Sequence, residues 1–502
     1  MKKIKYSIFI FLVFSIFTSC YKEYLEPVPK TSISDLVAFD TRDRILQQVT
    51  GLYVPIKSGQ YLGGRYQVYN DIRGGNFLNL RENGVTNFET WKINTSESTN
   101  EVINLWTQVY SAINRINVFL EGLEANQSKA VPSLISQDEF NQFKGEALAL
   151  RGMAYFHLSI LYARPFNQAK TRANSIPGMV LRLTAQRSAA DNAKERATVE
   201  ETFNQIVKDL VEAESLLSGT IPTNAVIRVT RMNRNTVNAL LTRVYLHMDN
   251  WPGVISAGNK IVSGAAPFSG TGGVPALATT FESIFRAPYT SSEAIFSIPN
   301  NPTELPGTQN QLGHYFSGRT QTGNLEYPIF TAGPLWSNLV AFPATDSRRL
   351  LTTTAEFPTG SGTFYRFIDK YTLFPHTDWS PVIRYAEVLL NVAEAEARST
   401  NSVSARAIAL LNAVYRRSNP TSAGYTQADF PSVDAFVNRL LEERSMEFLG
   451  EGIQNMDLMR RVLPLPAKTG VDAFPPSSVF YIWPIPNNER NTNELCVQNE
   501  PF

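Results

Sequence analysis

The chain has 502 residues, 43% of them hydrophobic and 18% charged, which is enough material for a large buried core in one domain or two. Lysine plus arginine total 46 against 45 acidic residues, and this near-balance gives no electrostatic case for nucleic-acid binding or for a basic membrane-binding face. Two cysteines and four scattered histidines show no spacing typical of a zinc site, so we expect no metal and no cofactor.

The first segment has the order of an export signal. Three lysines within the first five residues precede an apolar run over residues 6–17, and Thr18 and Ser19 stand directly before Cys20. This order is typical of a bacterial lipoprotein signal, in which residues 1–19 are removed and the Cys20 thiol is acylated. The apolar run is short for a helix that must cross about 30 Å of hydrocarbon. An ordinary signal peptide with an incidental cysteine, or an uncleaved anchor, are the alternatives.

The segment after the cysteine is polar and contains proline. We expect residues 20–35 to form a lipid-tethered leash between the membrane and the folded body. The body would then cover residues 36–502, with an N-terminal part over 36–262 and a C-terminal part over 263–502 packed as one unit. No later stretch reaches transmembrane length, so we expect this body to be soluble.

Several segments carry the apolar period of an amphipathic helix. In chain order these predicted helices cover residues 140–161, 203–217, 235–247, 254–262, 382–398, 404–417 and 433–449. Thr198 and Glu201 have the spacing of a capping box before the second helix, and Pro165 ends the first. Residues 251–253, Trp-Pro-Gly, are predicted to form the turn before the helix over 254–262.

The pairing of these helices predicts the fold. Alanines at positions such as 393, 395 and 397 permit close helix approach, so the helix pairs are similar to tetratricopeptide hairpins. No strict 34-residue period is present. Long stretches rich in Gly, Pro, Asn and aromatic residues, 58–100 and 264–380, separate the helices. We therefore expect a mainly α, tetratricopeptide-like helical-hairpin scaffold with a loop-rich, ligand-binding region. Short strands are expected at 294–298 and 479–483.

An ordered set of motifs in the C-terminal third carries a family resemblance. The motifs are YAEVLLNVAEA at 385–395, ERSMEFLGEG at 443–452, DLMRR at 457–461 and YIWPIP at 481–486. In this order they closely resemble the SusD/RagB family of Bacteroidetes outer-membrane nutrient-binding lipoproteins. The Trp106 segment and residues 145–156 agree with the family's first helices, so the resemblance spans nearly the whole mature chain. Gln454 occupies a position where the family usually has arginine, so one ion pair is expected to be absent.

The resemblance implies a function. Members of this family are outer-membrane, cell-surface lipoproteins that bind a glycan, or a peptide in the RagB branch. They act as a lid that delivers the ligand to a SusC-like TonB-dependent outer-membrane transporter. For this chain it implies a lipid anchor at Cys20, capture of an oligosaccharide or polysaccharide, a transporter partner and no enzymatic activity. A purely structural surface protein remains a further alternative.

Carboxylates near the C-terminus raise an enzymatic alternative. Glu443, Glu447 and Glu451 recur every four residues, and two of them could form the acid/base pair of an exported glycoside hydrolase. Like charges at this helical spacing are unfavourable unless cations intervene. Candidate cations are Arg444, Arg460 and Arg461. We therefore favour an ion-pair network that joins the last helices to the turn at residues 484–486.

Five residues are candidate ligand contacts, because the family takes its contacts from the loop before the Trp106 helix and from the middle of the chain. Trp91 is either a stacking platform for a sugar ring or a plug beneath its own loop. Arg81 and Asn94 are candidate partners for hydroxyl groups. Tyr315 lies in a polar stretch that favours exposure. Trp336 follows Gly-Pro and could instead open a helix and pack in the core.

Overall fold

The computed structural model describes residues 37–172, 174–307, 309–319 and 323–501. The expected signal, the lipidated Cys20 and the leash lie outside the described residues and stay predictions. No helix in the described ranges is long and apolar enough to cross a membrane.

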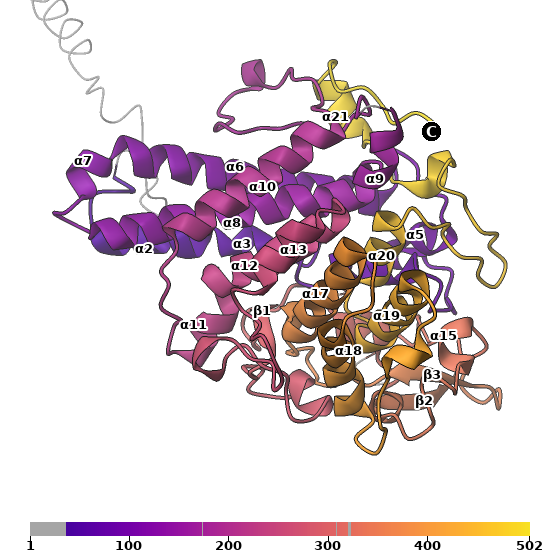
Figure 1. Ribbon diagram of the computed structural model, residues 1–502. Helices are drawn as coiled ribbons and strands as arrows, with labels where there is room; N and C mark the ends of the chain where they lie inside the picture. The colour runs from indigo at the N-terminus through magenta and orange to yellow at the C-terminus, as the bar shows by residue number, and fades with distance from the viewer. Residues whose placement is uncertain (1–36, 173, 308, 320–322, 502) are drawn as a thin grey trace, which may run out of the picture.

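The first half of the described chain is almost entirely helical. Its helices are α2 (Arg42–Gly51), α3 (Tyr53–Ile56), α4 (Arg65–Ile72), α5 (Phe88–Lys92), α6 (Asn100–Ala125), α7 (Gln127–Ala130), α8 (Gln137–Tyr162), α9 (Phe166–Ala169), α10 (Val199–Leu216), α11 (Ala225–Thr230), α12 (Arg234–His247) and α13 (Trp251–Gly258). The long helices α6, α8 and α10 lie side by side, with α8 in contact with both others (Figure 1).

Local signals account for where these helices begin. The α10 helix starts at the predicted capping box, where the backbone N–H of Glu201 donates to Thr198 Oγ1 and the Thr198 N–H donates to Glu201. A second capping box, Ser136 with Glu139, starts α8. Each box satisfies two backbone donors that the first helical turn would otherwise leave unpaired. The predicted helices over 140–161 and 203–217 are confirmed.

The predicted turn at residues 251–253 is wrong. Trp251 is the first residue of α13, and Asn250 caps the helix by accepting a 3.1 Å hydrogen bond from the N–H of Gly253. Pro252 is tolerated there because its missing N–H belongs to the first helical turn, where that donor has no intrahelical partner. The helix therefore starts three residues earlier than its apolar period suggests.

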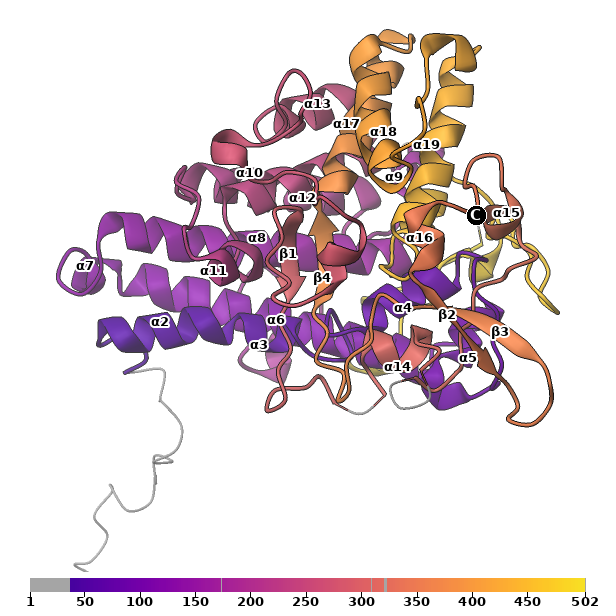
Figure 2. The same ribbon diagram turned by 90° about the horizontal axis from the view of Figure 1, so that it is seen from below.

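The second half alternates short strands, short helices and three long helices. Its elements are β1 (Ala294–Ile298), α14 (Leu312–Phe316), α15 (Pro334–Ser337), α16 (Ser347–Leu350), β2 (Thr352–Glu356), β3 (Phe364–Ile368), β4 (Ser380–Arg384), α17 (Tyr385–Thr400), α18 (Ala405–Ser418), α19 (Val433–Glu447), α20 (Gln454–Arg460) and α21 (Asn487–Thr492). Helices α17, α18 and α19 stand together at the top of Figure 2.

Two strand predictions have different outcomes. The strand over residues 294–298 is confirmed as β1, which pairs antiparallel with β4 so that Ala294 faces Arg384. The expected helix over 382–398 is wrong at its start, because residues 382–384 belong to β4 and α17 begins at Tyr385. The strand expected at 479–483 is also wrong, since Val479–Tyr481 forms a single 3-10 turn.

The hydrophobic core joins the two halves. The largest cluster of buried side chains runs from Ala38 to Cys496 and includes residues of α6, α8, α12 and α17. Hairpin-like pairs pack within it, α12 against α13 and α17 against α18, while α13 also contacts α17. Ala395 of α17 is fully buried against Leu246 and Val254, where a larger side chain would force the helices apart. The mainly α, tetratricopeptide-like helical-hairpin fold is confirmed.

The long loops gather at one end of this scaffold. Strands β2 and β3 form an antiparallel hairpin, and single bridges join Ser317 to Ile368 and Phe77 to Ile329. These contacts bring the loop before α6 beside α14 and the hairpin. Figure 2 shows α4, α5, α14 and the hairpin together at the lower right. The loop before α6 and the segments from the middle of the chain, both predicted to carry ligand contacts, therefore meet at one end of the scaffold.

Candidate ligand-binding site

A polar hollow lies in the loop directly before α6. Its volume is about 380 Å³, and it is lined by Gly84, Glu89, Asn94, Ser96, Ser98, Thr99, Asn100 and Glu101. The exposed side chain of Asn94 belongs to this lining, so the structure places one predicted contact residue in a cavity. Hydroxyl, amide and carboxyl groups converge in the hollow, which is the chemistry that recognises a polyhydroxylated ligand. We call it the α6 hollow.

One carboxyl group at the α6 hollow, that of Glu101, is buried. Glu101 is 2% exposed, and its burial raises the pKa of its carboxyl to about 7, with the nearby Glu89 acting in the same direction. Thr90 Oγ1 lies 3.4 Å from Glu101 Oε1. The N-cap residue of α6, Thr99, makes no side-chain hydrogen bond to the helix. The first turn of a 26-residue helix therefore borders the hollow without a side-chain cap.

Arg81 stands three residues before the hollow begins and is held from two sides. Its Nε donates to the backbone oxygen of Asn324 over 2.7 Å, and its guanidinium carbon lies 4.8 Å from the centroid of the Phe357 ring. Tyr365, half-buried in β3, belongs to the same apolar cluster as Phe357. The guanidinium is exposed and oriented, as the sequence prediction of a polar contact requires.

Trp91 lies beneath this surface. Only 6% of the residue is exposed, and its indole N–H donates to the Phe77 backbone oxygen over 2.9 Å. The half-buried Phe88 covers it, with stacked rings whose centroids are 6.0 Å apart. Trp91 therefore matches the interpretation of a plug beneath its own loop. The indole face has no free side to offer a sugar in this arrangement. Phe88, which the sequence analysis did not single out, is the ring nearer to solvent.

The expected exposure of Tyr315 is wrong. Tyr315 is 0% exposed in α14, and its hydroxyl donates to the backbone oxygen of Gln309 over 2.6 Å. Its ring packs 6.1 Å from that of Tyr327, which is also fully buried. The polar residues around Tyr315 occupy the surface while the helix turns the ring inward. A polar sequence neighbourhood was therefore a poor guide to exposure at this position.

Trp336 is not part of the α6 hollow's lining and lies in the four-residue helix α15, which begins at Pro334 directly after Gly333. The predicted helix opening is confirmed. The guanidinium of Arg349 lies 4.5 Å from the indole and that of Arg366 lies 5.8 Å from it, and Trp336 is half-buried. Both arginines are close enough for cation–π attraction, which fixes the ring. Of the five candidates only Asn94 belongs to the hollow's lining, and Arg81 stands three residues before its first residue, Gly84. Trp91, Tyr315 and Trp336 do not belong to the lining.

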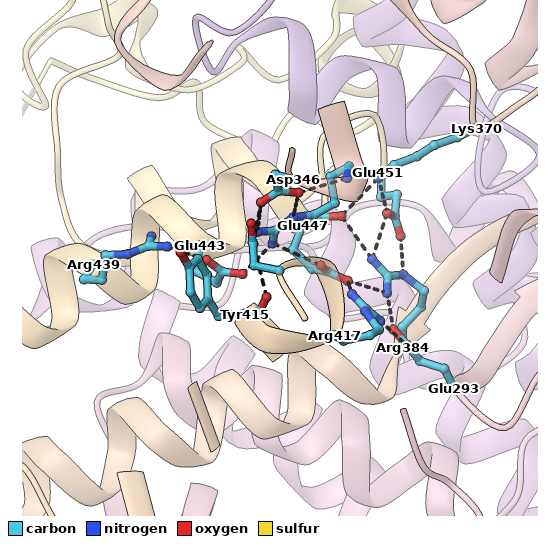
Figure 3. A network of polar contacts seen from close by, with 12 residues as sticks. Glu293, Asp346, Lys370, Arg384, Tyr415, Arg417, Arg439, Glu443, Glu447 and Glu451 are labelled. Carbon is cyan, nitrogen blue, oxygen red and sulfur yellow. Dashed lines mark hydrogen bonds and ion pairs between the residues drawn. The ribbon is translucent and has the colours of Figure 1, made fainter. Parts of the chain in front are cut away.

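The three C-terminal glutamates lie in a buried charge network (Figure 3). Glu443 pairs with Arg348 and Arg439, Glu447 with Arg348, Arg384 and Arg417, and Glu451 with Lys370 and Arg384. Burial alone would raise the pKa of Glu447, but Arg417, Arg384 and Arg348 together hold it well below its usual range. Every carboxylate of the series is ion-paired and at most 6% exposed, which is unsuitable for a glycosidase acid/base pair.

The expectation of an ion-pair network is therefore confirmed, but its predicted members are partly wrong. Arg444 and Arg460 both pair with Asp457, and Arg460 also pairs with Glu394. The turn at residues 484–486 is held by amides instead. Gln498 exchanges two hydrogen bonds of 2.7 and 2.9 Å with the Ile485 backbone. The glutamates reach cations on β4, α16 and α18, which no local spacing could have identified.

The described residues show no group of three or more His, Cys, Asp or Glu side chains placed to hold a metal ion together. The α6 hollow was missed by sequence reasoning apart from Asn94. A signal for it exists in hindsight, since residues 94–100 read NTSESTN directly before the long Trp106 helix. A run of small hydroxyl and amide side chains at a helix start predicts capping more often than binding, and only the folded loop forms the hollow.

Two family models match the chain. One, described as "Starch-binding associating with outer membrane", matches residues 23–246, and the other, described as "SusD family", matches residues 364–465. Together they cover the helical first half and the motif-bearing segment around β3 to α20. The matched segments contain the α6 hollow and most of the buried charge network.

Individual SusD-like proteins also match this chain over most of its length. A SusD superfamily protein from Bacteroides fragilis is 30% identical and superposes with a TM-score of 0.78, covering 91% of this chain and 99% of that one. SusD-like protein P25 of Formosa agariphila is 22% identical over 90% of this chain and 89% of its own length. Surface glycan-binding protein A from Bacteroides thetaiotaomicron, 17% identical, shares the fold with a TM-score of 0.70, covering 92% of this chain and 99% of its own.

Proposed function

Because this chain belongs to the SusD superfamily of outer-membrane-associated, glycan-binding proteins, we propose that it captures an oligosaccharide or polysaccharide at the cell surface and delivers it, as a lid, to a TonB-dependent transporter. Membership of this family supports glycan binding, and the α6 hollow is the place on this chain where we propose that the glycan binds. Peptide capture by the same mechanism is the alternative ligand class.

The observation that carries the proposal is the α6 hollow with Arg81 beside it. Asn94, Ser96 and Ser98 offer amide and hydroxyl groups to one cavity, and Arg81, three residues before the cavity's first residue, adds an oriented cation in the same loop. Phe88, Phe357 and Tyr365 supply half-buried rings in the same loop region, against which the C–H face of a sugar could pack. Sugar recognition needs both elements: polar groups that read hydroxyls and apolar faces that exclude water.

Calorimetric titration of the purified protein with a panel of soluble glycans and short peptides tests the ligand class. We expect at least one glycan to bind and Asn94→Ala to weaken it. Binding of peptides alone would transfer the proposal to the peptide branch, whereas no binding of either class would favour the purely structural alternative.

Delivery requires a partner and an anchor. We propose that Cys20 carries the lipid and that residues 20–35 form the leash which lets the body swing on a SusC-like transporter. Extraction of membranes with mild detergent should co-purify this protein with a barrel of transporter size. Cys20→Ser should release the protein from the membrane fraction without changing glycan affinity, and retention of that variant in the membrane would contradict the anchor.

A glycoside hydrolase is the enzymatic alternative, and the buried network argues against its most obvious carboxylates. Glu443 and Glu447 are fully buried and neutralised by arginines, so neither can exchange a proton with a substrate. Incubation of the purified protein with any glycan that it binds should release no reducing ends. Cleavage by the protein would overturn the binding-only proposal.

A further inference from the structure

Arg81 lacks the carboxylate partner that Arg319 and Arg286 of the same loop region have. Arg319 is paired with Asp369 at 2.8 Å, and Arg286 is paired with Glu282 at 3.1 Å. Within the described ranges no carboxylate oxygen lies within ion-pair distance of Arg81, whose side chain is nevertheless exposed. An exposed guanidinium that is held in place and left uncompensated is available to an anion from outside the chain.

The contacts of Arg81 fix the guanidinium but leave its fork open. Nε is used by the Asn324 carbonyl at 2.7 Å, and the flat face of the group rests over the Phe357 ring at 4.8 Å. Neither terminal nitrogen, Nη1 or Nη2, makes a hydrogen bond to another described residue. A planar guanidinium bound in this way presents two parallel N–H donors, which match the two oxygens of a carboxylate or a sulfate.

Arg81 and Arg65 both act on the neighbouring imidazole of His314. The backbone N–H of Asn324 donates a 2.7 Å hydrogen bond to the backbone oxygen of His314, and the carbonyl of the same Asn324 holds Arg81. Burial lowers the pKa of the His314 imidazole to about 4, with His376, Arg65 and Arg81 acting in the same direction. The imidazole thus senses the field of two arginines. Such a field disfavours a cation and attracts an anion.

The acidic groups nearby do not neutralise Arg81. Glu326 is fully buried, and its two oxygens accept hydrogen bonds from Thr86 and from Asn324 Nδ2, the latter over 2.9 Å. Burial raises the pKa of Glu326 to about 7 although Arg81 acts in the opposite direction, so this carboxyl senses the guanidinium without forming an ion pair with it. Glu82 is the adjacent exposed carboxyl and is not ion-paired with any described residue.

We propose that the ligand of this site is an anionic glycan, and that Arg81 binds its carboxylate or sulfate ester while the half-buried Phe357 and Tyr365 contact the sugar ring. This inference rests on the proposed function and specifies its substrate class. Uronate and sulfate ester share the required chemistry, two or more oxyanion oxygens in one plane or face, and the experiment below separates them.

Two matched polymer pairs test the proposal with the purified full-length protein. Polygalacturonate is compared with its fully methyl-esterified form, and dextran sulfate with dextran, so that each pair shares a backbone and differs in charge. We expect at least one charged polymer to bind tenfold or more tightly than its uncharged partner. A preference confined to polygalacturonate would assign a uronate, and one confined to dextran sulfate would assign a sulfate ester.

Arg81→Gln should abolish this preference, so that each charged polymer binds no more tightly than its uncharged partner. Arg81→Lys should keep the salt dependence of binding but regain only part of the affinity, because an ammonium lacks the fork. Arg416→Gln is the matched control, since Arg416 is also exposed, lies on α18 and makes no ion pair with a described residue. An equal loss in the Arg416 variant would mean general polyelectrolyte attraction and would overturn the proposal.

The outcomes separate this inference from the function on which it rests. Binding of uncharged polymers only, unchanged by Arg81→Gln, would refute the anionic ligand and leave glycan capture standing. Failure of all four polymers, together with failure of a broader glycan panel, would count against glycan capture itself. Circular dichroism and thermal melting of each variant exclude misfolding as the cause of any loss.

Discussion

Arg384 in β4 donates from Nη1 to Oε1 of Glu447 in α19 over 3.0 Å, although the two residues are 63 positions apart in the chain. Both side chains are fully buried, and Arg417 and Arg348 approach the same carboxylate. The pair joins the small β1–β4 sheet to the last long helix. Its glutamate belongs to a motif that identifies the family, and its role here is structural.

Neutralising this carboxylate should therefore destabilise the whole protein. Glu447→Gln leaves three buried guanidinium groups without part of their counter-charge, and removal of one partner from a buried ion pair typically costs about 3–5 kcal/mol. Urea denaturation followed by circular dichroism would measure the loss. Glu442→Gln is the control on the same helix, because Glu442 is exposed and its 3.7 Å pair with Arg439 should contribute less than about 1 kcal/mol. Equal effects of the two substitutions would contradict a special role for the buried network.

Asn94 in the α6 hollow should contribute to ligand affinity and little to stability. Its side chain is exposed, so Asn94→Ala should change the free energy of unfolding by less than about 0.5 kcal/mol. Loss of one amide contact to a bound glycan should cost about 1 kcal/mol of binding free energy, a factor of about five in Kd. Calorimetric titration measures the factor, and Asn141→Ala on α8 serves as control. Unchanged affinity would remove the hollow from the ligand site.

Trp91 should behave as a core residue. Trp91→Phe removes the donor of the 2.9 Å hydrogen bond to the Phe77 carbonyl and leaves that buried oxygen unpaired, which typically costs about 1–3 kcal/mol of stability. Ligand affinity of the folded variant should stay within about twofold of the parent. Should affinity fall tenfold with stability unchanged, Trp91 would be a ligand platform after all and the loop must open on binding.

Glu326 should make stability depend on pH. Burial raises the pKa of its carboxyl from 4.5 to about 7, so the folded state binds this proton more tightly than the unfolded state does. Its favourable contribution is complete below about pH 4.5 and is lost as pH rises through 7. Relative to the parent, Glu326→Gln should therefore gain stability as pH rises from 5 to 8, by about 1–3 kcal/mol at pH 8.

The measurement is a series of urea melts across that pH range. Glu82→Gln, in the same loop but exposed, should follow the parent curve. The stability of the Glu326 variant should still depend on pH to some extent, because burial also raises the pKa of Glu101 and of Asp71 to about 7. A Glu326→Gln variant whose stability follows the parent curve from pH 5 to 8 would contradict the raised pKa of Glu326.

Local signals were sufficient for the existence of the long helices but not for every helix start. The capping box at Thr198 and Glu201, the apolar period of α8 and the small residues of α17 act within about four positions, so they can be read from the chain alone. Local signals failed where a distant partner decided the outcome. Residues 382–384 continue an apolar pattern into α17, yet pairing with β1 makes them a strand.

Sequence alone thus determined the helical-hairpin class, the family resemblance and the membership of Arg81 and Asn94 in the exposed loop before α6. Only the tertiary structure decided that Arg348 of α16, Arg384 of β4 and Arg417 of α18 neutralise the C-terminal glutamates of the buried charge network, because all three lie far from them in the chain. Arg439 is the exception, since it stands four residues before Glu443 on the same helix. The tertiary structure also decided that Trp91 and Tyr315 are buried and that Arg81 has no carboxylate partner among the described residues. Burial and charge compensation depend on how distant segments pack, and neither is encoded in the spacing of neighbouring residues.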